Sequence, residues 1–559
     1  MKQHQQILFI SLLYILFISS VSSLNNNIVN DNIFLDELDK QWYSLTSDFK
    51  VIPGKDVNDS LAWGWFKDEL FLDGWGKLAV ETRSSVSDES IAFKAAGYLE
   101  GYLTWKYIYN FSVNYFESNF NTSNVKEFPM GVVNFVSDNI DYMQTQIAAN
   151  INSNDIYWNQ VSNAFDQLNG VYEGYNTAIS DPIYELSFLE IYLLNLYGDI
   201  GDIISATTGN NDEFKPMSRS DVEEYMATGG HCTALIKLTS NYSDLIVAHT
   251  TWADYSDMIR IYKRIIIPVS STPNGYETLF ASYPGLLVSI DDFYMIRPSK
   301  LMLTETLNSI LNQTLYTLIK PQSLLYWVRN LVANRLSSNG FDWVYYYIQN
   351  NSGTNNIQFM VVDYKLFTPN QMPGPGLLWI VEQYPGGYEA ADVTFSLLEH
   401  GYWGSFNRPY FLKVYDLLGY PYYSETYGSL FTYEYNPRAN IFRRDQSSVE
   451  SVEDIQSMIL YNQYKTDIYS DGYPGNAISA RYDIAATPMN PYSWFYHGTH
   501  GGIDGKAMNA AMFETYTVMA YNGPTVTSDC PPFSWSDWPD VSHIGMPDTF
   551  NFPWVNIKL

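Results

Sequence analysis

The spacing of apolar residues changes near residue 232, and this change limits the folds open to the chain. Between about residues 85 and 205 the chain is predicted to be mainly helical. Ala92–Tyr115 has few helix breakers and its apolar residues recur every three or four positions, and Leu186–Tyr197 contains neither proline nor glycine. Gly209–Ser220 is polar and is expected to form an exposed loop. From Cys232 onward the pattern favours strands.

Three strands are predicted directly after this change. They cover Cys232–Leu238, Leu245–His249 and Met258–Val269, with a turn signal at Asn241–Asp244 between the first two. Their spacing predicts an antiparallel meander.

The remaining half of the chain adds strands, one helix and long loops. Further strands are predicted at Gln358–Phe367 and Gly376–Glu382, with a helix at Leu301–Ile319 before them. From about residue 420 the chain is rich in Tyr, Pro, Gly and Asn, which indicates long ordered loops with short elements. A helical first part followed by strands and helices predicts an α+β fold.

An acidic composition excludes two classes of partner. The chain has 60 acidic and 31 basic residues, for a formal net charge of −29. Such a surface repels nucleic acids and anionic membrane faces. The simplest interpretation is solubility in an acidic compartment, where many carboxylates lose their charge.

The N-terminus has the features of a secretory signal. Lys2 precedes an apolar run, Ile7–Ile18, and the small polar stretch Ser19–Ser23 follows it. The run has roughly 12 residues, too few for the ~20 of a membrane span, so we expect cleavage near Ser23. We therefore expect a secreted or lysosomal protein without a transmembrane segment. The Asn-X-Ser/Thr sequons, which are candidate glycosylation sites, are at Asn58, Asn110, Asn121, Asn241, Asn312 and Asn350.

The chain has two cysteines, Cys232 and Cys530. Exported proteins usually commit cysteines to disulfides, so one possibility is a Cys232–Cys530 bridge that closes a very long loop. The other is a thiol kept for its reactivity.

The sequence around Cys232 suits a self-cleaving junction. In Gly229-Gly230-His231-Cys232-Thr233, two flexible glycines precede a nucleophile at the start of a predicted strand. The thiol would attack the His231 carbonyl, and water would release the upstream piece, leaving Cys232 with a free α-amino group. The reference pKa values are about 7.7–8.0 for that amine and about 8.5 for the thiol, so one residue can supply base and nucleophile. A plain turn before a strand, with an inert buried cysteine, is the alternative.

Several ordered blocks along the chain resemble one family. They are Gly230–Lys237, Ala248–Trp252, Met258–Lys263, Ala95–Thr104, Gly198–Asp202, Ser282–Gly285, Asp291–Tyr294, Asn351–Thr354, Gly376–Gly386 and Arg438–Asp445. The chain resembles the phospholipase B-like family, the group that includes lamina ancestor proteins, over almost its whole mature length.

The resemblance implies a fold, a maturation and an activity. The implied fold is that of N-terminal-nucleophile hydrolases, an αββα sandwich of two antiparallel sheets between helical layers. The implied maturation follows removal of residues 1–23: residues 24–231 are separated from the catalytic chain 232–559 but stay bound to it. The activity attributed to the group is removal of fatty acyl chains from glycerophospholipids. An amidase acting on N-acyl lipids or peptides, and a lipid-binding glycoprotein without catalysis, are the alternatives.

The resemblance also matches individual site residues. Cys232 matches the nucleophile, and His249 and Trp252 match pocket residues on the next strand. His249 would orient the amine or bind the acyl carbonyl, and Trp252 would wall the pocket. Ordinary core roles, a hydrogen-bonded histidine and a packed tryptophan, are the alternatives.

Further residues are candidates for stabilising the developing oxyanion or lining the site. Asn440 could donate an amide N–H to that oxygen, and Arg443 could steady Asn440 or lower the amine's pKa. Pairing of Arg443 with one of the many carboxylates is the alternative. Thr304 and Thr306 are candidates for the lining.

Other classes of site fit less well. His497 and His500 are three apart but are flanked by glycines, which favours a tight turn over a metal site. The local signature of papain-like proteases, the phosphate-binding loop and the dinucleotide fingerprint were not found. We therefore expect no metal and no cofactor.

Overall fold

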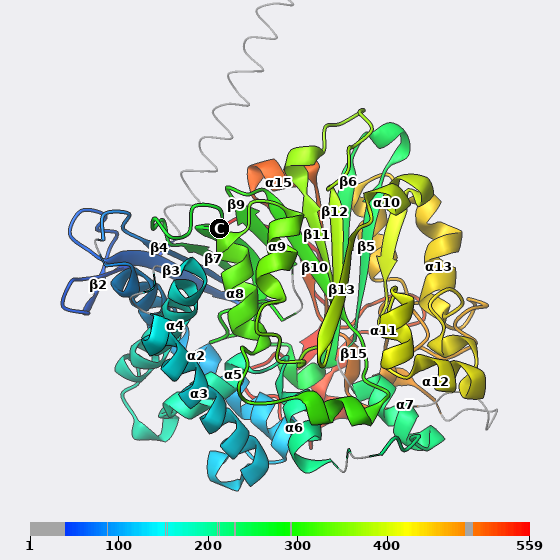
Figure 1. Cartoon of the computed structure of the whole chain (residues 1–559), viewed down its shortest axis with the longest axis horizontal. Coiled ribbons are helices and arrows are strands. Elements are labelled where there is room, and N and C mark those ends of the chain that lie inside the picture. Colours follow the sequence, from blue (N-terminus) through cyan, green and yellow to red (C-terminus); the bar gives the residue numbers. More distant parts are fainter. Residues whose placement is uncertain are drawn as a thin grey trace, which may run out of the picture.

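The computed structural model describes residues 40–559, apart from residues 87, 151–152, 154, 210, 212, 229–230, 291–292 and 487–495 (Figure 1). The side chains at 224, 226–228 and 231 are also outside the description. The predicted signal, residues 1–23, and the two glycines before His231 therefore lie outside the described residues.

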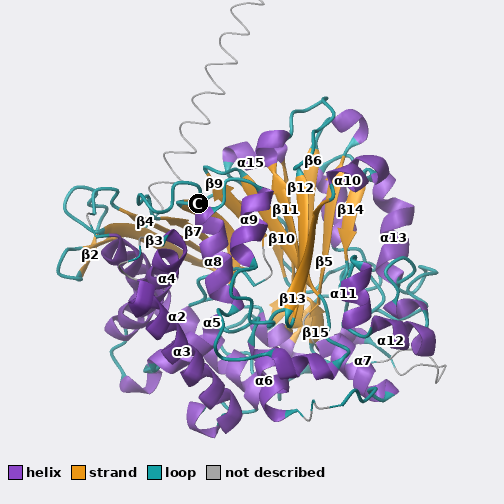
Figure 2. Ribbon diagram, in the orientation of Figure 1, coloured by secondary structure: helices purple, strands orange, loops and turns teal. Residues whose placement is uncertain are grey.

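Helices and strands segregate into layers (Figure 2). The helices are α2 (Glu89–Phe120), α3 (Met130–Asn150), α4 (Ile156–Ala178), α5 (Phe188–Asn195), α6 (Ile200–Thr208), α7 (Arg219–Thr228), α8 (Tyr326–Leu336), α9 (Gly340–Tyr347), α10 (Thr394–His400), α11 (Leu412–Leu417), α12 (Tyr420–Tyr427), α13 (Pro437–Asp445), α14 (Val452–Ile459) and α15 (Ala510–Thr515). The strands are β1 (Trp42–Leu45), β2 (Val51–Pro53), β3 (Ala62–Glu69), β4 (Trp75–Thr82), β5 (His231–Leu238), β6 (Leu245–Asp254), β7 (Arg260–Ile266), β8 (Glu277–Ser282), β9 (Phe293–Arg297), β10 (Leu301–Leu307), β11 (Ile357–Asp363), β12 (Leu378–Tyr384), β13 (Gly387–Asp392), β14 (Tyr402–Ser405), β15 (His500–Gly502), β16 (Asp504–Asn509), β17 (Val518–Asn522), β18 (Phe533–Ser534), β19 (Thr549–Phe550) and β20 (Val555–Ile557).

The helical character predicted for residues 85–205 is confirmed. Helix α2 contains all of Ala92–Tyr115, and α5 covers most of Leu186–Tyr197. Asp88 and Asp155 start α2 and α4, since their carboxylates accept hydrogen bonds from backbone N–H groups of the first turns. The described part of Gly209–Ser220 is mostly exposed, and α7 begins near its end.

Two large sheets form the centre of the molecule. The larger has the order β13-β12-β11-β10-β9-β8-β7-β4-β3-β1-β2. The smaller has the order β14-β5-β6-β16-β17-β20, with β15 also pairing with β6. Strand β5 pairs antiparallel with β6, which sets Cys232 opposite Thr251 and Ala234 opposite His249.

Apolar side chains fill the space between the two sheets and cover both outer faces. Ala234 and Ile236 of β5 share one buried cluster with Met302 and Met360 of the larger sheet. Their neighbour Leu235 points to the other side, because successive strand residues alternate faces. There it packs with residues of α13 and α14, including Phe442 and Ile459.

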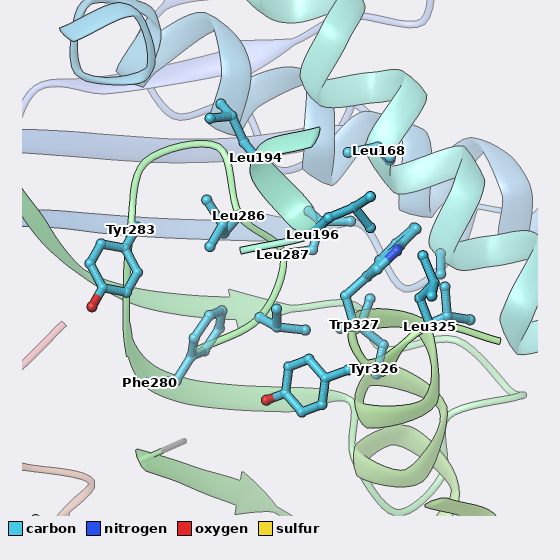
Figure 3. Packing of buried hydrophobic residues seen from close by; sticks show 14 of the residues in the cluster. Leu168, Leu194, Leu196, Phe280, Tyr283, Leu286, Leu287, Leu325, Tyr326 and Trp327 are labelled. Atoms are coloured by element: carbon cyan, nitrogen blue, oxygen red, sulfur yellow. The ribbon is translucent and has the colours of Figure 1, made fainter. Parts of the chain in front are cut away.

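The far face of the larger sheet is covered by helices of the N-terminal part and by α8. Phe280 of β8, Leu194 of α5 and Trp327 of α8 belong to this cluster (Figure 3). The order of layers is therefore helices, sheet, sheet, helices, with α8 and α9 on one side and α13 on the other in Figure 1. This agrees with the α+β prediction.

Two predictions, one about the order of the strands and one about a helix, were wrong. The strand predicted at Met258–Val269 exists as β7, but it belongs to the larger sheet, whereas β5 and β6 belong to the smaller one. The three strands therefore form no meander. In the larger sheet β7 runs parallel to β4, which makes that sheet mixed. The helix predicted at Leu301–Ile319 is instead strand β10, because its first part pairs with both β9 and β11, and a loop and a 3-10 helix at Gln313–Leu318 follow it.

The remaining predictions concern two strands, the glycosylation sequons and membrane crossing. The strands at Gln358–Phe367 and Gly376–Glu382 are confirmed as β11 and β12. Of the sequons, four have exposed asparagines (Asn58, Asn121, Asn241 and Asn350), while Asn110 and Asn312 are half-buried. None of the described helices has the length and apolarity needed to cross a membrane.

Glycines set how closely α2 and α4 approach. A Cβ atom added at Gly101 would lie 2.1 Å from the carbonyl oxygen of Val171, and one at Gly170 would lie 2.1 Å from that of Lys94. We expect Gly101→Ala to lower the free energy of unfolding by about 1–3 kcal/mol, because backbone atoms cannot yield cheaply. Thermal unfolding measures this. Gly201→Ala in α6 is the control, since nothing lies within 4 Å of the added atom. Equal stability of the two variants would contradict the prediction.

Candidate functional site

A cavity of about 340 Å³ lies at the start of β5. Its lining comes from strands β5, β6, β10 and β15, from helices α2, α6 and α7, and from the loops around them. The lining residues are Tyr115, Asn119, Tyr197, Gly198, Ile200, Gly201, Asp202, Ser205, Tyr225, Cys232, Thr251, Trp252, Ala253, Asp254, Asp257, Tyr283, Ile290, Glu305, Leu307, Asn308, Ser309, Ile310, Tyr316, Asn355 and His500. Of the residues predicted for the site, Cys232 and Trp252 line it.

Cys232 lies in the wall of this cavity with 6% of its surface exposed. Its Sγ is 4.0 Å from Oε1 of Glu305 on the opposite sheet. Its carbonyl oxygen accepts a hydrogen bond of 2.8 Å from Nη1 of Arg438. The thiol therefore faces a space that can take a ligand, while its main chain is held from behind.

The structure places His249 beside Cys232. His249 is fully buried, and its Nε2 lies 3.0 Å from the backbone oxygen of Glu305. Donor atoms of Cys232, His249 and Glu305 all lie within 4.8 Å of one another. Paired strands thus bring the thiol and the imidazole together, and β10 adds a carboxyl group that the sequence did not predict.

This trio is also a possible ligand set. It combines a thiol, an imidazole and a carboxylate, which zinc binds in proteins. Within the described part of the chain, these three side chains form the group of His, Cys, Asp or Glu donors that is close enough to hold an ion. His497 and His500 do not converge, since His500 Nδ1 lies 3.0 Å from Asp254 and His497 packs against Trp538.

Trp252 forms part of the wall. Its Nε1 donates to the carbonyl oxygen of Ile478 at 3.1 Å, and the guanidinium of Arg438 lies 4.4 Å from the centre of its ring. These contacts fix the indole plane beside Cys232.

Arg438 stands where the sequence predicted Asn440 and Arg443. Arg443 does donate to Oδ1 of Asn440, at 2.9 Å, but Arg443 is exposed and neither residue lines the cavity. The expectation that they face the oxyanion is therefore not supported by their placement. Arg438 is buried and binds the main chain of Cys232 and of Phe406. The turn of α13 explains this, because residues two and five positions later point away from it.

Thr304 and Thr306 do not line the cavity, whereas Glu305, which lies between them, does. Both are fully buried, and neither lines the cavity. Thr306 shares a hydrogen bond of 2.7 Å with Ser405, and Glu305 between the two threonines reaches the cavity instead. An isolated glutamate inside the apolar run Leu301–Leu307 is the signal that could have identified it.

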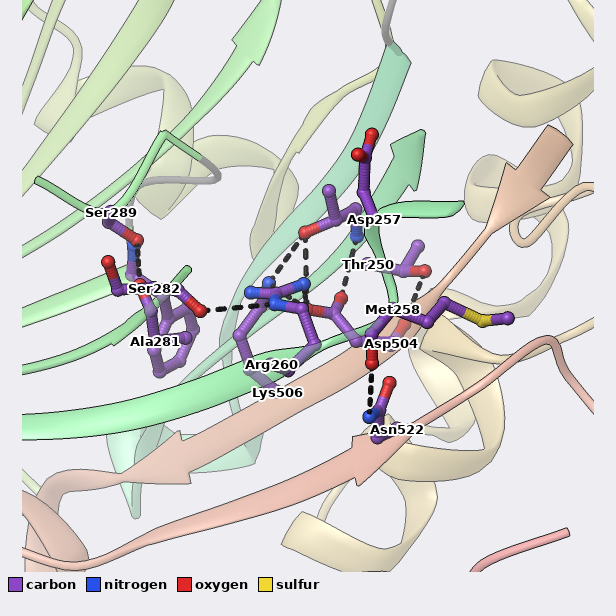
Figure 4. Close-up of polar contacts among 12 residues, drawn as sticks. Thr250, Asp257, Met258, Arg260, Ala281, Ser282, Ser289, Asp504, Lys506 and Asn522 are labelled. Carbon is purple, nitrogen blue, oxygen red and sulfur yellow. Dashed lines mark hydrogen bonds and ion pairs between the residues drawn. The ribbon is translucent and has the colours of Figure 1, made fainter. Parts of the chain in front are cut away.

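A buried ionic cluster lies behind the site (Figure 4). Asp504 of β16 accepts hydrogen bonds from Arg260 Nη1 at 2.6 Å, Lys506 Nζ at 2.7 Å and the backbone N–H of Thr251 at 2.9 Å. Burial would raise the pKa of Asp504, but the charges of Lys506 and Arg260 hold it below its usual range. Because Thr251 is the cross-strand partner of Cys232, this cluster fixes the strand next to the thiol.

The second cysteine is remote from the first. Cys530 is buried, its Sγ lies 3.8 Å from the carbonyl oxygen of Asn462, and burial raises the pKa of its thiol. The two cysteines form no disulfide with each other. The bridge considered from the sequence is therefore not formed.

Several carboxyl groups in or near the cavity have raised pKa values. Burial and the neighbouring Asp254 carboxylate raise the pKa of Asp257 to about 8. Burial raises the pKa of Asp202 to about 7 and that of Asp199, which lies behind it, to about 6. Glu382, on β12, is raised to about 7 by burial. Each of these groups prefers its neutral form in the folded protein.

Comparisons with known proteins agree along the whole chain. Residues 62–557 match the family model described as Phospholipase B. Phospholipase B-like protein E of Dictyostelium discoideum is 64% identical over 93% of this chain and 94% of its own length. Phospholipase B-like protein F of the same organism is 42% identical over 99% and 98% of the two chains. Phospholipase B-like 1 of Rattus norvegicus is 34% identical over 91% and 90%.

The raised carboxyl pKa values predict that the fold is more stable in acid. A carboxyl whose folded pKa is raised contributes stability that is fully present below its unfolded pKa of about 4 and is lost as pH rises through the folded value. For Asp199, Asp202, Glu382 and Asp257 the loss extends up to about pH 8. The lowered pKa of Asp504 acts in the opposite sense, but only as pH falls below about 4.

We therefore expect the free energy of unfolding at pH 5 to exceed that at pH 8 by at least about 1 kcal/mol, the equivalent of roughly one pKa unit. Denaturant unfolding at the two pH values measures it. The double variant Asp202→Asn with Asp257→Asn should flatten the dependence. Greater stability at pH 8 than at pH 5 would contradict this account.

Proposed function

The chain belongs to the phospholipase B family, and we propose from that premise that it is a hydrolase that removes fatty acyl chains from glycerophospholipids, with Cys232 as its nucleophile. The observation that carries the proposal is the thiol of Cys232 in a cavity wall, beside His249 and Glu305. A thiol needs a base to become nucleophilic, and an N-terminal amine on the same residue would supply one.

Self-cleavage between His231 and Cys232 would produce that amine. The Cys232 sulfur attacks the His231 carbonyl, the peptide nitrogen becomes an amine as the thioester forms, and water then releases the upstream carboxyl group. Arg438 and the Asp504 cluster hold the strand ends around Cys232. These contacts come from the C-terminal chain and would persist after the cut.

The two chains would stay associated after cleavage. Strand β4 of the N-terminal part pairs parallel with β7 from Trp75 opposite Arg260 to Glu81 opposite Ile266. Helices α2, α4 and α5 bury their apolar side chains in the same cluster as β8 and α8. Separation would expose this cluster to water at about 25 cal/mol per Å², so it is strongly disfavoured.

The proposed reaction has two balanced halves. In the first, the Cys232 sulfur bonds to the acyl carbonyl carbon and the thiol proton passes to the α-amine. The ester C–O bond then breaks, and the leaving alcohol takes that proton. In the second, water attacks the thioester carbonyl carbon and gives one proton to the α-amine. The C–S bond then breaks, the sulfur takes that proton from the amine, and a fatty acid leaves.

Glu305 and His249 would position this chemistry. The carboxylate of Glu305 lies close enough to the thiol to pair with an ammonium on the same residue. The imidazole of His249 is hydrogen-bonded to the backbone of Glu305, so it links β10, which carries the acid, to β6, the strand paired with the nucleophile's strand β5. An amidase of the same mechanism and a binding protein without turnover are the alternatives that the first experiment below separates.

An acidic compartment of the secretory route suits this enzyme. The four exposed sequon asparagines can take glycans without disturbing the core. The neutral form preferred by the buried carboxyls matches an acidic medium. We therefore propose a secreted or lysosomal glycoprotein, directed there by the segment 1–23.

Replacing Cys232 tests both steps. We expect Cys232→Ala to abolish cleavage and to lower acyl hydrolysis by at least about a thousandfold, because the nucleophile is lost. Gel analysis with sequencing of the fragment ends, and a panel of matched ester and amide lipids, are the measurements. Cys530→Ala is the matched control and should be cut and active.

A large chain that begins at Cys232 and turns over esters supports the proposal, whereas faster turnover of amides favours an amidase. Cleaved protein that hydrolyses neither ester nor amide would favour the binding protein. Full activity of Cys232→Ala would overturn the proposal.

Replacing Glu305 tests the carboxylate. We expect Glu305→Gln to lower kcat by about a hundredfold and to shift the pH profile of the reaction, because the charge beside the amine is removed. Steady-state kinetics between pH 4 and about 8 measure this. Glu277→Gln is the control, since Glu277 is a largely buried glutamate of the same sheet outside the cavity. An unchanged profile in Glu305→Gln would contradict a role for its charge.

A further inference from the structure

Carboxyl groups outnumber basic groups among the ionisable side chains of the cavity wall, in which His500 pairs with Asp254. Among the described residues that line it there are four carboxyl groups, those of Asp202, Asp254, Asp257 and Glu305, and there is no lysine or arginine. The potential inside a low-dielectric pocket follows its nearest charges. An anionic group would therefore be repelled from this space, and a cation would be attracted.

Asp257 offers an acceptor that no described residue uses. The residue is 3% exposed and lines the cavity. Its Oδ2 accepts a hydrogen bond of 2.6 Å from the phenol of Tyr197, but its Oδ1 is buried without a hydrogen-bond partner. An unsatisfied carboxylate oxygen of this kind is costly unless a ligand donates to it.

The charge of Arg260 lowers the pKa of Asp257, but Arg260 hydrogen-bonds to other groups. Arg260 donates to Asp504 at 2.6 Å and to the carbonyl oxygen of Ser282 at 3.3 Å. Figure 4 shows the carboxylate of Asp257 pointing away from the group formed by Arg260, Asp504 and Lys506. The charge of Arg260 is thus satisfied elsewhere, and Asp257 is left for the cavity.

Other unpaired acceptors lie in the same wall. Oδ1 of Asn308 is buried without a hydrogen-bond partner, and Asn308 is 1% exposed. The hydroxyl of Tyr115 is also unpaired. The rings of Tyr115 and Tyr197 stack on each other at 5.1 Å, and the Tyr197 hydroxyl already donates to Asp257. A protonated primary amine has three N–H donors and matches such a set of acceptors.

We propose that this cavity binds the primary ammonium group of the substrate's leaving half, so that the enzyme prefers ethanolamine-type glycerophospholipids to anionic ones. The inference rests on the proposed function, because it assigns a substrate class to the same site. The phosphate of such a lipid is balanced by its own ammonium, whereas a purely anionic headgroup brings uncompensated charge toward the carboxylates. A quaternary ammonium fits less well, because it has no N–H to give to Asp257.

The protonation of Asp257 is consistent with this assignment. Burial and the Asp254 carboxylate keep the pKa of Asp257 near 8, with the Tyr197 phenol and Arg260 acting against that rise. His500 pairs with Asp254 rather than with Asp257. A negative charge at this position is therefore disfavoured without a cation beside it, and an ammonium would supply one.

Turnover of matched lipids by the mature, cleaved protein tests the preference. Phosphatidylethanolamine, phosphatidylcholine and phosphatidylglycerol with identical acyl chains are compared in the same detergent micelles, together with a neutral monoacylglycerol. Wild type should turn over phosphatidylethanolamine at least about tenfold faster than phosphatidylglycerol, the value of one charge-assisted hydrogen bond. Asp257→Asn should lose this ratio when each rate is divided by the same variant's monoacylglycerol turnover, because the carboxylate that distinguishes the two headgroups is removed.

The control variant is Asp199→Asn, which alters a fully buried carboxyl outside the lining and should keep the wild-type ratio. A second measurement is independent of turnover and of variant folding. Calorimetry on wild type should show glycerophosphoethanolamine binding at least about tenfold more tightly than glycerophosphoglycerol.

Equal turnover of the ethanolamine and glycerol lipids, or an unchanged ratio in Asp257→Asn, would overturn the inference. A choline lipid that is turned over faster than the ethanolamine lipid would also overturn the assignment to a primary amine. If no ester is hydrolysed, the proposed function fails. Calorimetry then still decides whether the cavity selects an ammonium, and equal affinity for the two glycerol phosphodiesters would refute it.

Discussion

Asp504 ties the two sheets together beside the reactive thiol. Its carboxylate receives Arg260 from the larger sheet, Lys506 from its own strand and the backbone N–H of Thr251, which stands opposite Cys232. Burying three charged groups carries a large desolvation cost, and it is tolerable here because each charge finds hydrogen-bonded partners of opposite sign. The distance between the sheets, and hence the meeting of Cys232 and His249 with Glu305, follows from this cluster.

The cavity uses charge in the opposite way. Behind the thiol, Arg260 and Lys506 share the carboxylate of Asp504, whereas the described lining of the cavity has four carboxyl groups, no lysine or arginine, and one histidine, His500, paired with Asp254. In a neutral medium such an arrangement costs stability, because charges of one sign are buried together. In an acidic medium protons relieve that cost, and a bound ammonium can do the same. The acidic surface of the chain fits the same surroundings, so the proposed compartment and the proposed ligand preference would share one electrostatic origin with the expected stability in acid.

Local patterns in the sequence predicted much of the fold. The helices of residues 85–205 and the strands β5, β6, β11 and β12 follow from hydrophobic spacing that their own residues carry. Which sheet a strand joins depends on partners far along the chain. For this reason the spacing along the sequence predicts β7 beside β6, whereas in the structure β7 pairs with β4 and β8. The spacing of apolar residues in Leu301–Ile319 also fits a helix. Pairing of the first part with β9 and β11 makes it a strand.

The site was predictable only where a resemblance or a strand pairing carried it. Hairpin spacing and the family blocks led to Cys232, His249 and Trp252. Glu305, Asp257, Arg438 and His500 come from separate elements, and the fold alone brings them to Cys232 or to its cavity. On α13, the buried Arg438 lies on a different face of the helix from Asn440 and Arg443, a difference that residue type does not reveal.

The central claim is that the thiol of Cys232, at the start of its own chain, carries the acyl group. Rapid acid quench of the enzyme during turnover, followed by mass spectrometry of its peptides, tests this most directly. The account predicts an added acyl mass on a peptide whose first residue is Cys232, bound as a thioester that hydroxylamine removes. An unmodified Cys232 during turnover, or a peptide in which His231 is still joined to Cys232 in the active protein, would contradict it.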